Sequence, residues 1–204
     1  MVQTIQAEQL QLHDLKSKFG LEYRDSPDLF SEWRDNLPEL KEQEKANLDE
    51  VKLEFRHLLE YGMAETIVKM VIISPLLKMA GFFLPPFNIT AEKTVEISEQ
   101  DDLSIRGRLD LLVFQPEFWI LVVETKGLAY SIEKGLPQLL GYMLGSPNHH
   151  KPVFGLISNG ANFKFLKLIR EDHPIYCESI SFSLDRGDDL ELVLRILKKI
   201  AKIV

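Results

Sequence analysis

The chain has 204 residues, of which 45% are hydrophobic and 27% are charged, and its formal net charge is −7. This composition predicts one substantial hydrophobic core and excludes an intrinsically disordered chain. The negative charge argues against a protein whose main task is to coat nucleic acid, since phosphate neutralisation needs clustered Lys and Arg.

The cysteine content and the hydropathy of the chain indicate in which cellular compartment it is expected. The single cysteine, Cys177, cannot form an internal disulfide or a thiolate zinc cluster, so we expect a reducing cytoplasmic location. Residues 1–19 are polar and mixed in charge, which predicts that they are not a secretory leader. The most apolar stretch, residues 70–87, is interrupted by prolines and by Lys78, so we expect no membrane span.

The first third of the chain reads as helical. Residues 1–62 show no strand-like alternation, and their apolar residues recur at helical spacing within a charge-rich sequence. We therefore predict a helical N-terminal extension over residues 1–62 and a second domain over residues 63–204. Within that domain, residues 63–81 are too apolar for a surface helix and predict a buried one, which ends at Gly81.

Strand-like runs follow at residues 89–97, 105–114 and 119–125. The last two are joined by Gln115, Pro116 and Glu117, which predicts a hairpin. The remaining pattern predicts a helix over 131–144, strands over 153–158, 163–169 and 176–184, and a closing amphipathic helix over 188–204. The predicted fold class is α/β, with a mixed central β-sheet flanked by helices and preceded by the helical extension.

Charged residues lie at the ends of two otherwise apolar strands. Side chains alternate along a strand, so Glu124 and Lys126 point to the same face. A hairpin that turns around Pro116 would set Asp110 opposite Val122 and diagonal to Glu124, again on this face. The sequence therefore predicts that two acids and a lysine converge at neighbouring strand ends.

This trio has the parts that phosphodiester hydrolysis requires: a hard cation, an activated water and a positive group near the developing charge. We expect Asp110 and Glu124 to bind Mg²⁺, or Mn²⁺ in its place, with the backbone carbonyl of Thr125 as a further oxygen ligand. Lys126 would orient the water or help to deprotonate it.

The same register permits a structural interpretation, because it sets Arg108 opposite Glu124 in a cross-strand ion network. Against this interpretation, the charges end two strands that are otherwise almost wholly apolar, where unpaired charge is costly to bury. Charges in such positions favour a functional role.

The segments Arg106-Gly-Arg-Leu-Asp110 and Val122-Val-Glu124-Thr-Lys126 resemble the PD-(D/E)xK nuclease superfamily, and most closely the N-terminal nuclease domain of type I restriction motor subunits. Leu109 replaces the proline of the superfamily's name. The resemblance implies a restriction-endonuclease-like fold and cleavage of DNA. It covers residues 63–169.

The resemblance also implies two further site residues. Glu65 matches an acidic residue that assists the metal site from the helix before the sheet, and Gln138 matches a downstream glutamine that would steady Lys126 or a phosphate. Each has an alternative: Glu65 as a surface partner of Lys69, and Gln138 with Tyr142 as a polar helix edge that carries a half-buried tyrosine. Pro137 implies that the helix holding Gln138 begins there or kinks.

The hypothesis from the sequence is thus a Mg²⁺-dependent endonuclease of the restriction-modification or repair kind, acting on DNA as a homodimer or with partner subunits. The alternative hypothesis is a non-catalytic nucleic-acid- or protein-binding module on the same fold. No phosphate-cradling loop of the ATPase type is present in the sequence, so the chain is not predicted to be an ATP-driven motor alone.

Overall fold

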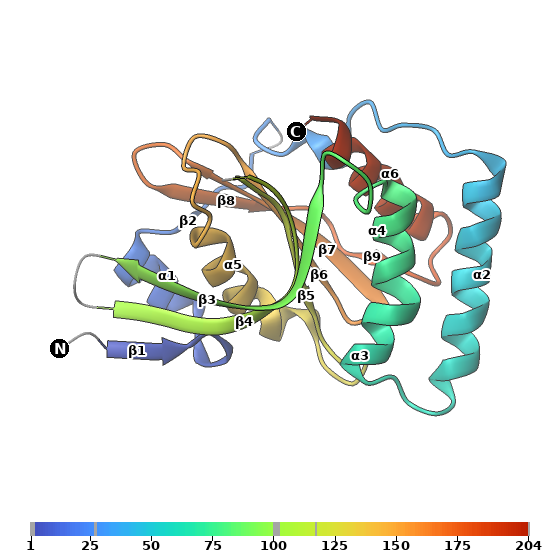
Figure 1. Ribbon diagram of the computed structural model, residues 1–204, viewed down its shortest axis with the longest axis horizontal. Helices are drawn as coiled ribbons and strands as arrows, with labels where there is room; N and C mark the ends of the chain where they lie inside the picture. The colour runs from blue at the N-terminus through green and yellow to red at the C-terminus, as the bar shows by residue number, and fades with distance from the viewer. Residues whose placement is uncertain (1–2, 27, 100–102, 117, 204) are drawn as a thin grey trace.

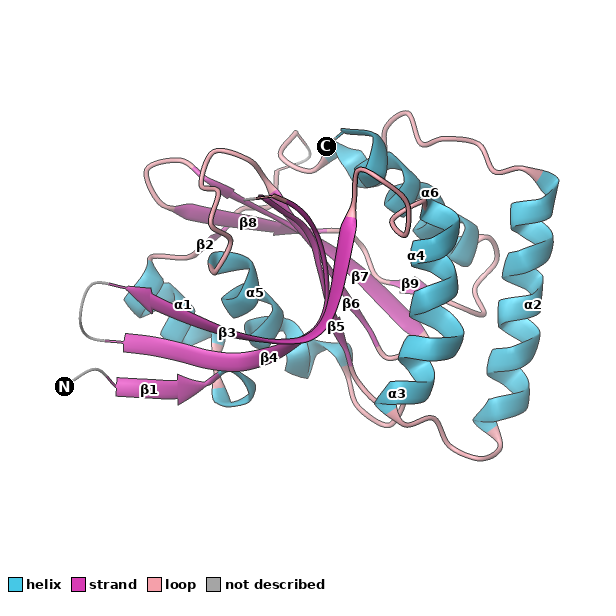
Figure 2. Cartoon of the chain, in the orientation of Figure 1, coloured by secondary structure: helices cyan, strands magenta, loops and turns pink. Residues whose placement is uncertain are grey.

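A computed structural model describes residues 3–26, 28–99, 103–116 and 118–203 of the chain. Figure 1 follows the chain from the N-terminus to the C-terminus, and Figure 2 separates helices from strands. The strands are β1 Gln3–Gln6, β2 Glu22–Tyr23, β3 Asn88–Glu99, β4 Leu103–Gln115, β5 Phe118–Thr125, β6 Val153–Ser158, β7 Asn162–Arg170, β8 Pro174–Glu178 and β9 Phe182–Ser183. The α-helices are α1 Leu12–Phe19, α2 Glu42–Leu59, α3 Glu65–Val68, α4 Ser74–Ala80, α5 Leu136–Leu144 and α6 Asp189–Ile203. Short 3-10 helices are η1 Ala7–Gln9, η2 Ser31–Trp33 and η4 Ile132–Gly135, and η3 Lys69–Ile73 is a π-helix.

The strands of the described residues form one mixed sheet in the order β1-β4-β5-β6-β7-β8-β2, with β3 paired to β4 and β9 paired to β7. The pairs β1–β4, β5–β6 and β2–β8 are parallel, and the others are antiparallel. The β4–β5 hairpin is present as predicted, although Glu117 of its turn lies outside the described residues. The predicted mixed α/β fold is confirmed.

Helices cover both faces of the sheet, and each face has its own apolar cluster (Figure 1). On one face, here called the α4 side, α4 and α6 cover the sheet, and α2 packs outside them against η3 and α6. On the other, the α5 side, η1 and α5 cover the sheet, and α1 packs against α5. All eight residues of β5 are buried, because this central strand is covered on both faces. No helix in the described part of the chain is long and apolar enough to cross a membrane.

Two predicted elements differ in detail. The buried helix predicted over residues 63–81 runs from α3 through the π-helical η3 to α4, and it ends at Gly81, whose φ of 94° only glycine adopts readily. The single strand predicted over residues 176–184 is wrong, because β8 and β9 are separate. Residue Pro137 stands in the first turn of α5, so the helix begins there and does not kink.

Residues 1–62 contain α1 and α2 but also β1 and β2, so the prediction that this region has no strands is wrong. These strands have four and two residues, which is too short to show alternation in a sequence. They nevertheless pair with β4 and β8, at the two ends of the strand order. The division at residue 62 stays a prediction, and the sheet itself crosses it.

We predict that Leu15→Ala lowers the free energy of unfolding of the whole chain by about 2–5 kcal/mol, because the Leu15 side chain is fully buried on the α5 side. Urea denaturation followed by circular dichroism measures this change. Lys16→Ala, at an exposed position of the same helix, is the matched control. An unchanged main transition for Leu15→Ala would mean that the first residues fold apart from the sheet.

Candidate active site

The register of β4 and β5 sets Asp110 near Glu124. Leu111 pairs with Val123 and Leu112 pairs with Val122, so the predicted pairing of Asp110 with Val122 is wrong by two residues. A bulge between Val113 and Phe114 shifts the register. Because the error is an even number of residues, it leaves Asp110 beside the end of β5, at the level of Glu124.

Asp110 lies where the alternation of β4 changes phase. Leu109 and Leu112 belong to the cluster on the α5 side, whereas Leu111 packs against the cluster on the α4 side. In an unbroken strand, residues 109 and 111 would share a face. Across from Asp110 on β3, Glu92 has a φ of 58°, a left-handed conformation. Groups from both sides of the sheet can therefore reach the Asp110 carboxylate.

Both oxygens of Asp110 accept hydrogen bonds. The amide and the hydroxyl of Thr125 each donate to Oδ2 at 2.6 Å, and the Lys69 ammonium donates to Oδ1 at 2.7 Å. Asp110 is 7% exposed. Thr125 thus contacts Asp110 as a donor, while the role predicted for its carbonyl stays a prediction.

Glu124 is the most deeply buried carboxylate of the site, at 2% exposure. Its Oε1 accepts a hydrogen bond from Lys126 Nζ at 2.7 Å, whereas Oε2 has no hydrogen-bond partner among the described residues. Burial raises the pKa of Glu124 to about 8, the charge of Asp110 acts in the same direction, and Lys126 opposes both. A buried carboxylate oxygen without a donor is a position for a cation or a proton.

Lys126 is fixed by a chain of hydrogen bonds that passes through α5 and ends on β4. Its ammonium donates to Gln138 Oε1 at 2.9 Å, and Gln138 donates through Nε2 to the Tyr142 hydroxyl at 3.1 Å. The Tyr142 hydroxyl in turn donates to the carbonyl of Arg108 at 3.1 Å. Tyr142 is fully buried, not half-buried, so these polar groups form an interior network and not a helix edge.

Arg108 does not pair with Glu124, so the cross-strand ion network considered from the sequence is wrong. The Arg108 side chain is exposed, and its Nε lies 2.6 Å from Glu92 Oε2. Glu92 and Lys69 are site residues that the sequence analysis did not single out. Only the spacing of Glu65 and Lys69, four residues apart, signalled that Lys69 lies near the site.

Gly135 was also missed. A Cβ at this position would lie 2.8 Å from Lys126 Cε and 3.5 Å from Glu124 Cγ. Glycine therefore lets η4 pass close to this ion pair, and a larger residue would push the lysine aside. A glycine in a sequence gives no sign of such an approach unless the tertiary neighbours are known.

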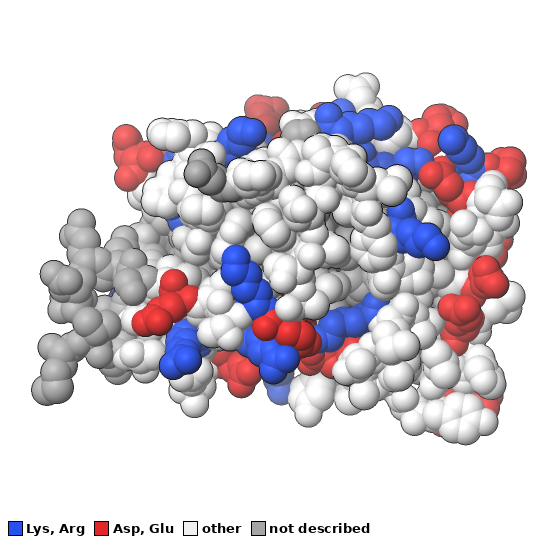
Figure 3. All heavy atoms as spheres, viewed as in Figure 1, with Lys and Arg blue, Asp and Glu red and all other residues white. Residues whose placement is uncertain are grey.

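The predicted site residues Glu65, Asp110, Glu124, Lys126 and Gln138 surround one open pocket of about 590 Å³. The pocket is also lined by Glu8, Glu92, Arg108, Gly127, Tyr130 and Lys134. Its charges are mixed, and Figure 3 likewise shows Lys and Arg interspersed with Asp and Glu over β3, β4 and α3. The structure thus brings the five residues together, and their catalytic roles stay predictions.

The donor set of this pocket suits a hard divalent cation in part. Within the described ranges, no three His, Cys, Asp or Glu side chains are grouped as a metal site, and lysine ammonium groups lie between the carboxylates instead. The unpartnered Oε2 of Glu124, close to the charge of Asp110, is the oxygen that a cation would satisfy. Glu65 lies at the same pocket, 3.0 Å from Lys69.

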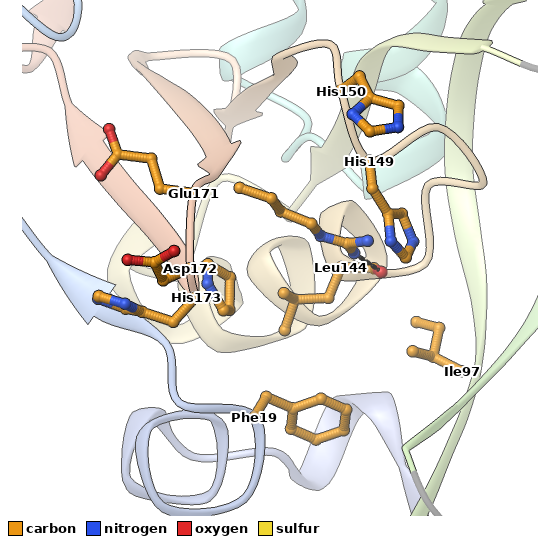
Figure 4. Close-up of a pocket in the computed structure, with 10 residues that line it drawn as sticks. Phe19, Ile97, Leu144, His149, His150, Glu171, Asp172 and His173 are labelled. Carbon is orange, nitrogen blue, oxygen red and sulfur yellow. Dashed lines mark hydrogen bonds between the residues drawn. The ribbon is translucent and has the colours of Figure 1, made fainter.

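A second cavity, of about 440 Å³, lies at the other end of α5 from Gln138 (Figure 4). His149 and His150 reach it from the loop after α5, and His173 reaches it from the turn between β7 and β8. His173 Nε2 contacts Glu22 Oε2 at 2.7 Å, so this histidine is held against β2. The cavity has none of the residues predicted for catalysis.

No protein-family model and no curated protein matches the chain. Among solved structures, a fragment described as the HsdR subunit of a type I restriction enzyme from Vibrio vulnificus is similar, with 24% sequence identity and a TM-score of 0.40. The match covers 51% of this chain and 21% of that one, so the chain spans much less than the length of its structural neighbour.

The buried carboxylate predicts a pH dependence of stability. Because the pKa of Glu124 is raised from 4.5 to about 8, the native state binds more protons than the unfolded state between these values. Stability then falls as the pH rises from about 5 to 8, by an amount on the order of a few kcal/mol. Glu124→Gln should remove this part of the dependence, as measured by urea denaturation with chelator present.

Glu178→Gln is the matched control, because it removes a partly buried carboxylate that is paired with Lys164 outside the pocket. This variant should keep the wild-type pH profile. If Glu124→Gln and wild type instead lose stability in parallel, the buried carboxylate does not hold its proton in the native state.

Proposed function

We propose that the chain is a metal-dependent nuclease that hydrolyses phosphodiester bonds in DNA, with Mg²⁺ or Mn²⁺ as its cofactor. The observation that carries the proposal is the convergence of Asp110, Glu124 and Lys126 on one open pocket, where one buried oxygen of Glu124 has no partner in the described part of the chain. A buried acid with a strongly perturbed pKa and a specific charged neighbour is typical of a functional site.

Asp110 and Glu124 would hold the cation, with Glu65 assisting from α3 and the Thr125 carbonyl as an additional oxygen ligand. A bound divalent cation would offset charge on the phosphate and lower the pKa of a bound water. Two carboxylates on adjacent strands, Asp110 within β4 and Glu124 near the end of β5, suit this role, because both strands are fixed in the sheet.

Lys126 would act on the substrate itself. Its ammonium is held by Glu124 and Gln138, so its position is set before a phosphate arrives. A positive group placed in advance stabilises charge that develops in the transition state. Gln138 is a positioning residue in this scheme, because it steadies Lys126 through the network that continues to Tyr142.

Arg108 and Lys134 line the same pocket and supply further positive charge for the phosphate backbone. Base recognition would come from a second copy of the chain or from restriction or repair subunits, and the setting would be the cytoplasm.

The competing proposal is a binding module on this fold. The ion pairs that Lys69 makes with Asp110 and Lys126 makes with Glu124 favour it, because they stabilise the pocket without a metal.

We predict that Lys126→Ala and Asp110→Asn each lower the cleavage rate by about 100-fold or more, because each removes charge from the reaction centre. The assay uses supercoiled plasmid, linear double-stranded DNA, single-stranded DNA and RNA, each with Mg²⁺, Mn²⁺ or chelator. Circular dichroism checks that each variant folds.

Lys167→Ala is the matched control, since Lys167 is a partly buried lysine on β7 that pairs with Glu32 away from the pocket. It should cleave like wild type. Cleavage that persists in chelator, or that survives Lys126→Ala at full rate, would contradict the proposal. Binding of DNA that is the same with and without metal, without nicking, would favour the binding module.

A further inference from the structure

Lys69 is a charged residue behind the pocket, in contact with three of the acids that line it, and the proposed hydrolysis does not use it. Its ammonium lies 2.7 Å from Asp110 Oδ1, 3.0 Å from Glu65 Oε1 and 3.1 Å from Glu92 Oε1. The side chain is 16% exposed. One ammonium group thus occupies the centre of three carboxylates that come from α3, β3 and β4.

The local backbone directs Lys69 to this place. Lys69 is the first residue of the π-helical η3, and its carbonyl accepts from the amide of Ser74, five residues on. Pro75 follows and has no amide hydrogen, which favours a local departure from regular α-helical bonding. Segments of π-helix within an α-helix occur frequently at functional sites.

The ion pairs hold the lysine firmly in its charged form. Burial alone would lower the pKa of Lys69, but hydrogen bonds to Asp110, Glu65 and Glu92 outweigh it and raise the pKa above its ordinary value. The lysine therefore supplies a permanent positive charge beside Asp110.

A divalent cation and the Lys69 ammonium would compete for Asp110. A Mg²⁺ ion lies about 2.1 Å from a ligand oxygen, so binding through Oδ1 would put it within about 5 Å of Nζ. Two positive charges at this separation repel strongly inside a partly buried site. The Oδ2 oxygen offers no easy alternative, because Thr125 already donates to it twice.

Glu124 offers an open position for a ligand in the same pocket, independently of Lys69. It lines the same pocket, is 2% exposed, and has an Oε2 atom that no described residue satisfies. Lys69 does not fill that position, since its ammonium contacts Asp110, Glu65 and Glu92.

We propose that Lys69 is an internal cation that competes with the divalent ion: it balances Asp110, Glu65 and Glu92 in the metal-free protein and moves off Asp110 when the ion binds. Lys69 thereby sets the metal concentration at which the site fills. This inference rests on the divalent cation of the proposed function.

Calorimetric titration with MnCl₂ tests the inference without reference to cleavage. Lys69→Gln, which keeps a polar side chain but removes the charge, should bind Mn²⁺ about tenfold more tightly than wild type or better. Lys69→Arg, which keeps the charge, should bind no more tightly than wild type. The matched control is Lys164→Gln, since Lys164 also contacts two carboxylates, Glu133 and Glu178, and it should leave Mn²⁺ affinity unchanged.

A second measurement uses the wild-type chain and does not depend on the folding of a variant. With [ε-¹³C]lysine incorporated, the Lys69 resonance is assigned as the one missing from the Lys69→Arg spectrum. Titration with MgCl₂ should move this resonance. The midpoint of the shift should equal the Kd that calorimetry gives for Mg²⁺. A resonance that stays fixed while Mg²⁺ binds overturns the inference.

The two proposals fail in different ways. If wild type binds Mn²⁺ and Lys69→Gln binds it equally or less tightly, Lys69 is not a competitor, and the nuclease proposal stands. If neither wild type nor Lys69→Gln binds Mn²⁺, both the competing cation and the metal-dependent nuclease are overturned.

Discussion

The site depends on one costly interaction, the burial of the Glu124 carboxyl group near the end of a strand whose first six residues are apolar. Ionisation of Glu124 is tolerated only when a partner compensates the charge; Lys126 bonds one oxygen, and the other has no partner among the described residues. The surrounding structure follows from that constraint. Gly135 leaves room for the ion pair, Gln138 takes a second hydrogen bond from the lysine, and Tyr142 anchors Gln138.

Two lysines, one from each face of the sheet, form ion pairs with the acids of the site: Lys69 with Asp110 and Lys126 with Glu124. Lys126 belongs to the network that runs through α5, whereas Lys69 comes from the helix that packs on the α4 side. Asp110 can meet Lys69 because the alternation of β4 changes phase at this residue. The carboxylates of one pocket are thus stabilised by cations from opposite layers of the fold, which couples the site to the packing of both layers.

The sheet supplies the rigidity that such a site needs. β4 and β5 are each paired on both sides along the part that carries the site, and β5 is covered by helices on both faces. Side chains at the ends of such strands have little freedom to move apart when charge is buried between them. The pocket is open to solvent, and Arg108, Lys134 and Tyr130 line it together with the acids. Solvent can therefore reach the pocket while the sheet fixes the acids.

The sequence by itself determined the mixed sheet, the β4–β5 hairpin and the closeness of Asp110 to Glu124 and Lys126, because alternation and apolar runs are local properties of a strand. The predicted position of Asp110 at a strand end is wrong, because β4 continues beyond it to Gln115. It also indicated Glu65 and Gln138, through a family resemblance, as neighbours of that trio. Tertiary structure alone decided the two-residue shift in register, the short strands β1 and β2, and the contact of Lys69 with Asp110. These features arise from a bulge and from pairing between distant segments, which leave no periodic trace in the chain.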